Sequence, residues 1–309
     1  MNDLCVPQGS VIGAYLFILY INDMPDALVE TTVNLFADDT LLYVFGNDMA
    51  EMTERISNDL KRIENWLKAN KLKINEQKTK VMQLQGGRGI NSVNLTMNGV
   101  GLETVKSIKY LGIMIDNKVN LKENIQLLCK KVARKIGVFS RISKNLTFKA
   151  RVSVYKSIIA PHFDYCASLL LTANKSEMEK MQKLQNKAMR TILRCRRDTS
   201  IKSMLDKLAI MSVKQRIWFQ TLKLVHKIKN KMVPEYLVEQ TRTNGDVHGR
   251  NLRGRNDFRL PTVNKKATQN MMLYVGLKQF NEMPIEIKSE KMTRRFEIKL
   301  SEFVMKKIE

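Results

Sequence analysis

The sequence predicts an α+β fold, in which a small antiparallel sheet and a few helices precede a mainly helical second part. Two apolar, β-prone runs, 33–37 and 41–45, lie close together near the N-terminus. From residue 120 onward, apolar residues instead recur every three or four positions, which is the helical period. With 44% hydrophobic residues among 309, the chain can bury a core and is not expected to be disordered.

Basic residues dominate the composition. The chain carries 53 Lys and Arg against 30 Asp and Glu, a formal charge of +23, which indicates a polyanionic partner such as nucleic acid or an anionic lipid surface. Residues 1–50 contain no Lys or Arg and seven acids, so they sum to −7 and leave +30 for residues 51–309. This division is typical of a metal site beside a polyanion-binding surface. The alternative is that the acids only cap helices and fill turns.

Several classes of protein are excluded. Four cysteines without C-x-x-C spacing and only three histidines exclude a zinc finger and a disulfide scaffold, and indicate a reduced, intracellular chain of the nucleus or cytoplasm. The longest apolar run, Val11 to Ile21, is about half as long as a bilayer span and predicts a buried helix. We therefore expect no membrane partner. A membrane-surface protein would also need a strongly amphipathic basic helix, which the sequence lacks.

Residues 1–117 mix strands with helices. The two apolar runs flank Asp38-Asp39-Thr40, which predicts a hairpin with a tight acidic turn at its apex. A helical stripe follows, formed by Met52, Ile56, Leu60, Ile63 and Leu67. Strand-like pieces are expected around 80–85, 93–97 and 108–115. Gly86-Gly87-Arg88-Gly89 lacks the spacing of a phosphate-binding loop and predicts a turn.

One helix in the mostly helical stretch 120–233 has a distinctive basic face. Its apolar stripe is Met178, Met181, Leu184, Ala188 and Ile192, and beside it run Lys180, Lys183, Lys187, Arg190 and Arg194. A solvated face is the usual explanation of such a stripe. Because few acids balance it, contact with nucleic-acid phosphates becomes a specific hypothesis. Residues 240–270 predict an Arg-rich loop that contacts nucleic acid, and 271–309 predict helices broken at Met283-Pro284.

The adjacent carboxylates of Asp38 and Asp39 suggest chemistry. Mg²⁺ prefers oxygen ligands and usually keeps substrate phosphates in its shell. In phosphoryl transfer, two such ions activate the attacking hydroxyl and stabilise the leaving group. An acidic pair in a turn is weak support for a metal site when taken alone, because Asp is common in turns.

Four segments in order strengthen this hypothesis. They are P-Q-G-S-V-I-G at residues 7–13, F-A-D-D at 36–39, the lysine-bearing stretch 70–80, and K-Y-L-G at 109–112. Together they closely resemble motifs B, C, D and E of the reverse transcriptases of non-LTR (LINE-type, jockey-like) retrotransposons. Segments 155–161, 184–190 and 233–237 also resemble the thumb of that family and the segment after it.

The resemblance implies a role for each matching residue. Asp38 would bind Mg²⁺ directly with Asp39 supporting the site, and Lys78 would face the pyrophosphate. Further roles fall on the nucleotide- and template-binding residues Gln8, Gly9 and Ser10, and on the primer grip Tyr110, Leu111 and Gly112. The basic helix would hold the phosphates of the template–primer. The implied partners are an RNA template, a DNA primer, their RNA–DNA hybrid and a dNTP; the sequence does not indicate an oligomeric state.

The resemblance also predicts the organisation of the chain. Residues 1–117 would be an incomplete polymerase palm, 118–235 a helical thumb-like region, and 236–309 a basic loop with C-terminal helices. Motif A and the fingers, which precede motif B in the family, are absent, and Cys5 and Ala14 replace a usual Gly and Pro. The chain is thus expected to be the C-terminal part of a reverse transcriptase, with exposed apolar surface and a tendency to aggregate.

Two functions remain open at this point. The first is part of an RNA-directed DNA polymerase that works by two-metal nucleotidyl transfer. The second is a catalytically inactive remnant that grips RNA or RNA–DNA hybrid through its basic helices.

Overall fold

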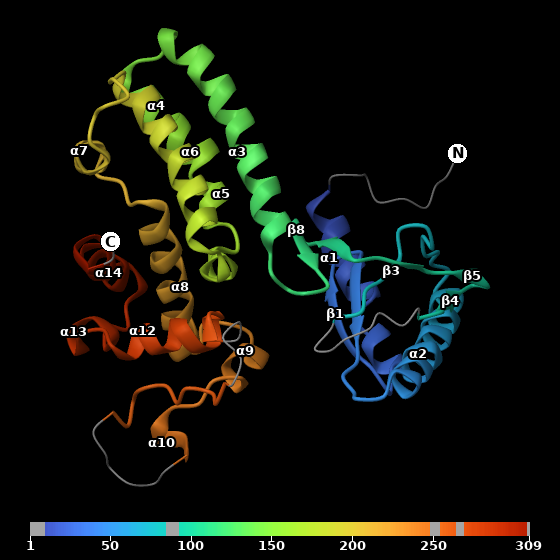
Figure 1. Cartoon of the computed structure of the whole chain (residues 1–309). Helices are drawn as coiled ribbons and strands as arrows, with labels where there is room; N and C mark the ends of the chain where they lie inside the picture. Colours follow the sequence, from blue (N-terminus) through green and yellow to red (C-terminus); the bar gives the residue numbers. More distant parts are fainter. Residues whose placement is uncertain (1–9, 85–92, 248–253, 264–268, 308–309) are drawn as a thin grey trace. The chain divides into compact units, whose positions relative to one another are not determined.

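The computed structural model describes residues 10–84, 93–247, 254–263 and 269–307 (Figure 1). The chain divides into two compact units, Met1–Val119 and Asn120–Glu309. The expected turn at Gly86–Gly89 lies outside the described residues. Helices and short two-stranded sheets are both present, so the mixed character of the fold is as predicted.

The first unit begins with helix α1 (Val11–Tyr20), the short 3-10 helix η1 (Met24–Ala27), strands β1 (Thr32–Phe36) and β2 (Asp39–Tyr43), and helix α2 (Met49–Ala69). The predicted hairpin is confirmed, because β1 and β2 pair antiparallel over their whole length. The predicted helix is also confirmed. Asp48 caps it by accepting a hydrogen bond from the N–H of Ala50 at 2.9 Å, which sets where α2 begins.

The remaining strands are short. β3 (Lys80–Val81) pairs with β6 (Glu103–Thr104), β4 (Thr96–Met97) pairs with β5 (Val100–Gly101), and β7 (Ser107–Tyr110) pairs with β8 (Ile113–Asp116). The β3–β6 pair is parallel, so the prediction of an entirely antiparallel sheet is wrong at this position. Among the described residues the strands form two-stranded ladders rather than one sheet, since residues of positive φ such as Asn98 and Gly99 turn the chain after only two paired residues.

The core of the first unit forms around α2. Leu60 and Ile63 are buried, together with apolar residues of the segment 93–102. Leu42 of β2 packs against the same cluster. An amphipathic helix buries one stripe in this way, and here the stripe links the hairpin to the later strands.

Helix α1 forms as predicted, but the prediction that it is buried is wrong. None of its residues is buried, and Val11 and Leu19 are 73% and 71% exposed. One hydrogen bond ties its end to the unit, from the Tyr20 hydroxyl to the carbonyl oxygen of Asn70 at the end of α2. An apolar run indicates that a helix would be more stable when buried, but it does not specify which residues would cover the helix. In the described part of the chain, no helix has the length and apolar character needed to span a bilayer.

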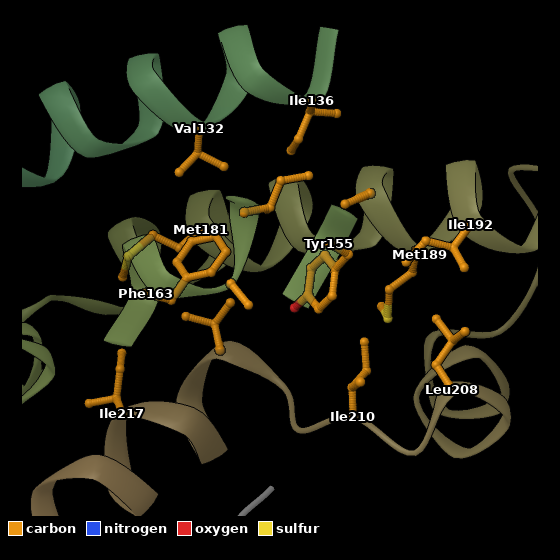
Figure 2. Close-up of a cluster of buried hydrophobic side chains, with 14 of the residues drawn as sticks. Val132, Ile136, Tyr155, Phe163, Met181, Met189, Ile192, Leu208, Ile210 and Ile217 are labelled. Carbon is orange, nitrogen blue, oxygen red and sulfur yellow. The ribbon is translucent and has the colours of Figure 1, made fainter. Parts of the chain in front are cut away.

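The second unit is helical, as predicted for 120–233. Its first part contains α3 (Lys122–Ile142), α4 (Phe148–Val154), α5 (Pro161–Asp164), α6 (Lys175–Leu193), α7 (Ile201–Leu208) and α8 (Val213–Lys229), with short 3-10 or π turns at Ser143–Asn145, Tyr155–Ile159 and Ala167–Thr172. Side chains from these helices meet in one buried cluster (Figure 2). Val132 and Ile136 of α3 face Met181 and Met189 of α6 there, so α3 and α6 pack side by side.

The C-terminal elements are α9 (Glu235–Glu239), α10 (Asn244–Val247), the π turn η5 (Met272–Gly276), α12 (Leu277–Asn281), α13 (Ile285–Lys288) and α14 (Thr293–Lys307). A second cluster joins α8 to η5, α12, α13 and α14. Leu222 and Val225 of α8 are buried with Phe280 and Phe296 in this cluster. The predicted break at Met283-Pro284 is confirmed, because Pro284 caps α13. Helix α8 contributes Ile217 to the first cluster and Leu222 to the second, so it is common to both.

Candidate functional site

The acidic pair lies at the end of the β1–β2 hairpin. Phe36 pairs with Asp39, so the connection is the two residues Ala37 and Asp38. The prediction that both acids occupy the turn is therefore half wrong, because Asp39 is already the first residue of β2. Ala37 has a φ of +51°, a left-handed conformation that suits the first position of a tight hairpin but is unfavourable for alanine.

Both carboxylates of this pair face solvent. Asp38 and Asp39 are exposed, and neither takes part in an ion pair or a hydrogen bond with another described side chain. A carboxylate without a cationic partner keeps its oxygen lone pairs available. The hairpin thus presents two adjacent hard oxygen donors at one tip.

A buried aspartate, Asp59, holds the chain that leads into this hairpin. Its carboxylate oxygens accept hydrogen bonds from the backbone N–H groups of Val29, Glu30 and Thr31 at 3.2, 3.0 and 2.7 Å. They also accept from the Thr31 hydroxyl at 2.7 Å and from Arg62 Nη1 at 2.6 Å. Burial alone would raise the pKa of Asp59, but these hydrogen bonds outweigh it and lower the pKa to about 2.

The role of Asp59 was not predicted from the sequence, although the sequence contains a signal for it. Asp59 lies between Ile56 and Ile63 on α2, three residues after one and four before the other. That is a position on the apolar stripe, where a carboxylate must find hydrogen-bond partners if it is to be buried. An acid within an apolar helical stripe therefore predicts a structural anchor.

Lys78 lies on a separate turn of the same unit. The side chain is exposed. Asn75 organises the turn: its carbonyl oxygen and its side-chain Oδ1 each accept a hydrogen bond from the N–H of Lys78 at 3.1 Å. Thr79 donates to the Asn75 carbonyl oxygen through both its N–H, at 3.1 Å, and its hydroxyl, at 3.0 Å. The backbone at Lys78 is therefore fixed, while its ammonium group faces solvent.

The segment predicted as a primer grip is the turn of the β7–β8 hairpin. Tyr110 pairs with Ile113, so Leu111 and Gly112 form the two-residue connection. Both have positive φ, +45° and +81°, the pattern of a type I′ turn in which glycine at the second position avoids a steric penalty. The sequence Leu-Gly at this point thus sets the direction in which the hairpin reverses.

The structure describes only one of the three predicted nucleotide-binding residues. Ser10 is the N-cap of α1, and its side chain makes no capping hydrogen bond. Gln8 and Gly9 lie outside the described residues. Ser10, Asp38, Lys78 and Gly112 belong to the same compact unit, but no hydrogen bond or ion pair of the described residues joins Asp38 or Asp39 to Lys78.

The acidic tip fits part of a metal-ligand set. Within the ranges that the structure describes, no group of three or more His, Cys, Asp or Glu side chains is arranged to hold a metal ion. Two exposed carboxylates are nevertheless the kind of donor that Mg²⁺ takes in sites completed by water and substrate phosphates. The donor chemistry at Asp38 and Asp39 is thus compatible with Mg²⁺, and the set is partial.

In the second unit, the predicted basic stripe follows α6 but its members differ in environment. Lys180, Lys183 and Lys187 are exposed, and no ion pair of the described residues includes them. Arg190 and Arg194, by contrast, donate to backbone carbonyl oxygens, of Arg197 in one case and of Ser143 and Lys144 in the other. The stripe is therefore three free lysines followed by two arginines held in place. Both acids near it, Glu177 and Glu179, lie at the beginning of the helix, where Glu177 completes a capping box with Asn174.

Residues 2–115 match the family model described as reverse transcriptase (RNA-dependent DNA polymerase). The chain is 29% identical over 198 residues to the RNA-directed DNA polymerase from mobile element jockey of Drosophila melanogaster, an alignment that covers 60% of this chain and 21% of the relative. It is 28% identical over 208 residues to the probable RNA-directed DNA polymerase from transposon X-element of the same species, covering 62% and 22%. A Pol polyprotein of the type-1 retrotransposable element R1 from Nasonia vitripennis is 27% identical over 213 residues, covering 64% and 62%. The chain thus spans about a fifth of the length of the first two relatives.

Proposed function

Starting from residues 2–115, which carry a reverse transcriptase domain related to those of non-LTR retrotransposons, we propose that this chain supplies part of the active site of an RNA-directed DNA polymerase. The observation that carries the proposal is the exposed acidic tip at Asp38 and Asp39, which forms no ion pair with another described residue and lies on a hairpin whose preceding residues, Glu30 and Thr31, are hydrogen-bonded to Asp59. A rigid support for exposed carboxylates is what a site for a divalent cation requires.

Asp38 and Asp39 would hold Mg²⁺ through their carboxylate oxygens, with Asp38 as the direct ligand. Bound there, the ion would contribute stabilisation of the negative charge that develops during nucleotidyl transfer between the primer 3′-hydroxyl and the dNTP. The two carboxylates would fix the position of the bound ion, and therefore the position of its positive charge. Asp38 lies in the turn and Asp39 is the first paired residue of β2, so both carboxylates lie at the tip of the hairpin.

Lys78 would donate a proton or a charge-assisted hydrogen bond to the leaving pyrophosphate. The turn that Asn75 organises supports this role, because it fixes the backbone at Lys78 while leaving the ammonium free. The β7–β8 turn at Tyr110, Leu111 and Gly112 would contact the primer strand. Gln8, Gly9 and Ser10 would lie against the incoming nucleotide and the templating base.

In this proposal, residues 1–117 act as a palm, 118–235 as a thumb and 236–309 as an appended basic region. RNA template and DNA primer would be held as a hybrid by phosphate contacts from Lys180, Lys183, Lys187, Arg190 and Arg194. Such contacts position a duplex without reading its sequence. The exposed lysines on α6, which form no ion pair with another described residue, support this part of the proposal.

A second candidate is binding of RNA or RNA–DNA hybrid without polymerisation. The net charge of +23 and the free lysines of α6 favour it, and the partial ligand set at the acidic tip offers no complete metal site within the described residues. In this case the basic helices would still bind nucleic acid, while Asp38 and Asp39 would have no catalytic role.

Primer extension separates the two candidates. The chain would be given an RNA template, a DNA primer, dNTPs and Mg²⁺, beside Asp38→Asn and the control Asp26→Asn, which changes an exposed acid of η1. Extension that Asp38→Asn abolishes and Asp26→Asn leaves intact supports the polymerase. Hybrid binding without extension in any of the three proteins supports the binding module and overturns the catalytic proposal for this chain.

A further inference from the structure

A basic hollow lies where the C-terminal ends of α3 and α6 meet. Its volume is about 420 Å³, and its lining is Ser140, Ser143, Lys144, Arg190, Thr191 and Arg194. Three of the six lining residues are cations, and the other three carry hydroxyl groups. Cations of this kind are groups that proteins use to bind phosphate, whereas the hydroxyls of Ser143 and Thr191 already donate to the carbonyl oxygens of Ser140 and Lys187.

Two of the cations are already held in position. One guanidinium nitrogen of Arg194 donates to the carbonyl oxygens of Ser143 at 3.1 Å and Lys144 at 2.8 Å. Arg190 donates from Nη2 to the carbonyl oxygen of Arg197 at 3.1 Å. These bonds fix both side chains before any ligand arrives, so binding an anion costs less conformational entropy than it would at a mobile lysine.

One donor of the lining also lacks an acceptor. The Nε of Arg190 is buried and has no hydrogen-bond partner among the described residues. A buried guanidinium donor without an acceptor costs free energy, which an anion bound in the hollow would recover.

No ion pair between described residues neutralises the positive charge of the hollow, because Lys144, Arg190 and Arg194 take part in none. Asp198, the acid closest to Arg194 in the sequence, pairs with Arg196 at 3.7 Å. The charge of the hollow is therefore available to an external anion.

We propose that this hollow binds one phosphate group of a nucleic-acid backbone. The row Lys180, Lys183 and Lys187 runs along α6 toward it, so a polyanion lying on the helix would end in the hollow. From Lys180 to its last residue, Leu193, the helix extends about 20 Å at 1.5 Å per residue, long enough for several phosphates of one strand. A small anion would need the hollow but not the row. The inference rests on the nucleic-acid binding in the proposed function and assigns to it Lys144, which the basic stripe does not include.

The two parts of this surface predict different responses to salt. In the hollow several cations would contact one phosphate, whereas each exposed lysine of α6 would contact a different phosphate. The plot of log K against log salt has a negative slope. A double variant of the hollow, Lys144→Gln with Arg190→Gln, should reduce the magnitude of this slope by about 0.9, the value for one phosphate. The matched control Lys180→Gln with Lys183→Gln, which removes the same charge from α6 outside the hollow, should lower it by about 1.8.

The experiment measures inorganic phosphate and hybrid binding with the whole chain. Phosphate should raise the melting temperature of the unchanged chain more than sodium chloride does at equal ionic strength. The hollow variant should lose this increment, and the lysine control should keep it. Hybrid affinity, from fluorescence anisotropy over a salt series, should fall by about 10-fold in the hollow variant. Lys144→Gln alone, which alters an exposed side chain, guards against misfolding caused by the loss of Arg190.

The outcomes are distinct. An increment with phosphate that survives in the hollow variant overturns the site, and so does an unchanged chain that responds equally to phosphate and chloride. A phosphate increment that the hollow variant loses without any change in hybrid binding shows a small-anion site and overturns the nucleic-acid assignment. Hybrid binding that depends on the hollow without primer extension leaves this inference standing while the polymerase proposal fails.

Discussion

The carboxylate of Asp59 binds Thr31 twice: Oδ2 accepts from the Thr31 backbone N–H and from its hydroxyl, both at 2.7 Å. Thr31 is the last residue before β1 begins. The buried acid on α2 therefore determines where the acidic hairpin starts and in which direction it leaves the core. A residue far from the tip of the hairpin thus helps to position the tip.

Replacing Asp59 should destabilise the first unit in a pH-dependent way. Its pKa of about 2 lies below the ordinary value of 3.8, so its stabilising contribution is complete above pH 4 and is lost as the pH falls toward 2. The shift corresponds to roughly 2 kcal/mol. Asp59→Asn should lower the free energy of unfolding at pH 7 by a similar amount and flatten its decline in acid, as urea titrations at pH 2.5 to 7 would show. The exposed Asp26→Asn serves as control, and an equal pH dependence in both variants would refute this role.

The positive φ of Ala37 predicts a stabilising substitution. A left-handed conformation costs a non-glycine residue about 1–2 kcal/mol, while glycine costs about 0.5–1 kcal/mol in unfolded-chain entropy. Ala37→Gly should therefore raise the stability of the first unit by up to about 1 kcal/mol. Ala50→Gly, at the first turn of α2, removes the same methyl group from a helical position and should lower stability instead. Thermal unfolding of the two variants measures the difference, and destabilisation by both would contradict the strain at Ala37.

The Lys78 turn makes a kinetic prediction that depends on the polymerase proposal. Lys78→Gln should reduce single-nucleotide incorporation by about 100-fold, because a positioned proton donor contributes at least that much. Asn75→Ala should give a smaller reduction, since it loosens the turn but keeps the ammonium. Lys73→Gln, an exposed lysine of the same segment, is the control. Rapid-quench incorporation assays decide the matter, and equal rates for Lys78→Gln and Lys73→Gln would exclude the proposed role.

The buried His226 predicts weaker folding of the second unit in mild acid. Its Nε2 lies 2.6 Å from the carbonyl oxygen of Glu290, and its ring stacks on Phe296 with centroids 3.8 Å apart. Burial lowers the pKa of His226. A lowered pKa means that the unfolded chain takes up a proton more readily, so stability is complete above about pH 6.5 and falls below it.

Comparing His226→Gln with the unchanged chain tests this assignment. Unfolding by urea at pH 7.5 and pH 5.5 should show a loss of stability in the unchanged chain that is reduced in the variant. His162, whose pKa is also lowered by burial and by Lys135 and Lys131, contributes in the same direction. His162→Gln is therefore the matched comparison, and a larger effect there would move the assignment from His226 to His162.

Much of the local structure could be predicted from periodicity. Helices α2 and α6 and the acidic hairpin follow from apolar spacing and turn chemistry, which are local properties. The burial of α1 could not be predicted, because an apolar run does not specify the surface that covers it. The parallel pairing of Lys80 with Glu103 depends on residues far apart in the sequence, which no local pattern reveals.

The candidate sites show the same division. Short motifs single out Asp38 and Lys78 as candidate site residues, whereas Asp59 acts through a fold-dependent contact with a loop 28 residues away in sequence. In the basic hollow, Arg194 meets Ser143 only because α3 and α6 pack side by side. Helical spacing placed Arg190 and Arg194 on a stripe, but it could not show that their guanidinium groups are fixed.

Helix α8 contributes residues to both hydrophobic clusters of the second unit, so neither part of the unit is expected to be stable to proteolysis without the other. A chain that ends after residue 235 would lack Phe280 and Phe296, and Leu222 and Val225 would be exposed to solvent on the same helix that supports the first cluster. Fragments that end there should be degraded rather than persist as a stable product. Cleavage within the polar stretch between α10 and η5, by contrast, should leave the two pieces associated, since their shared helix remains covered.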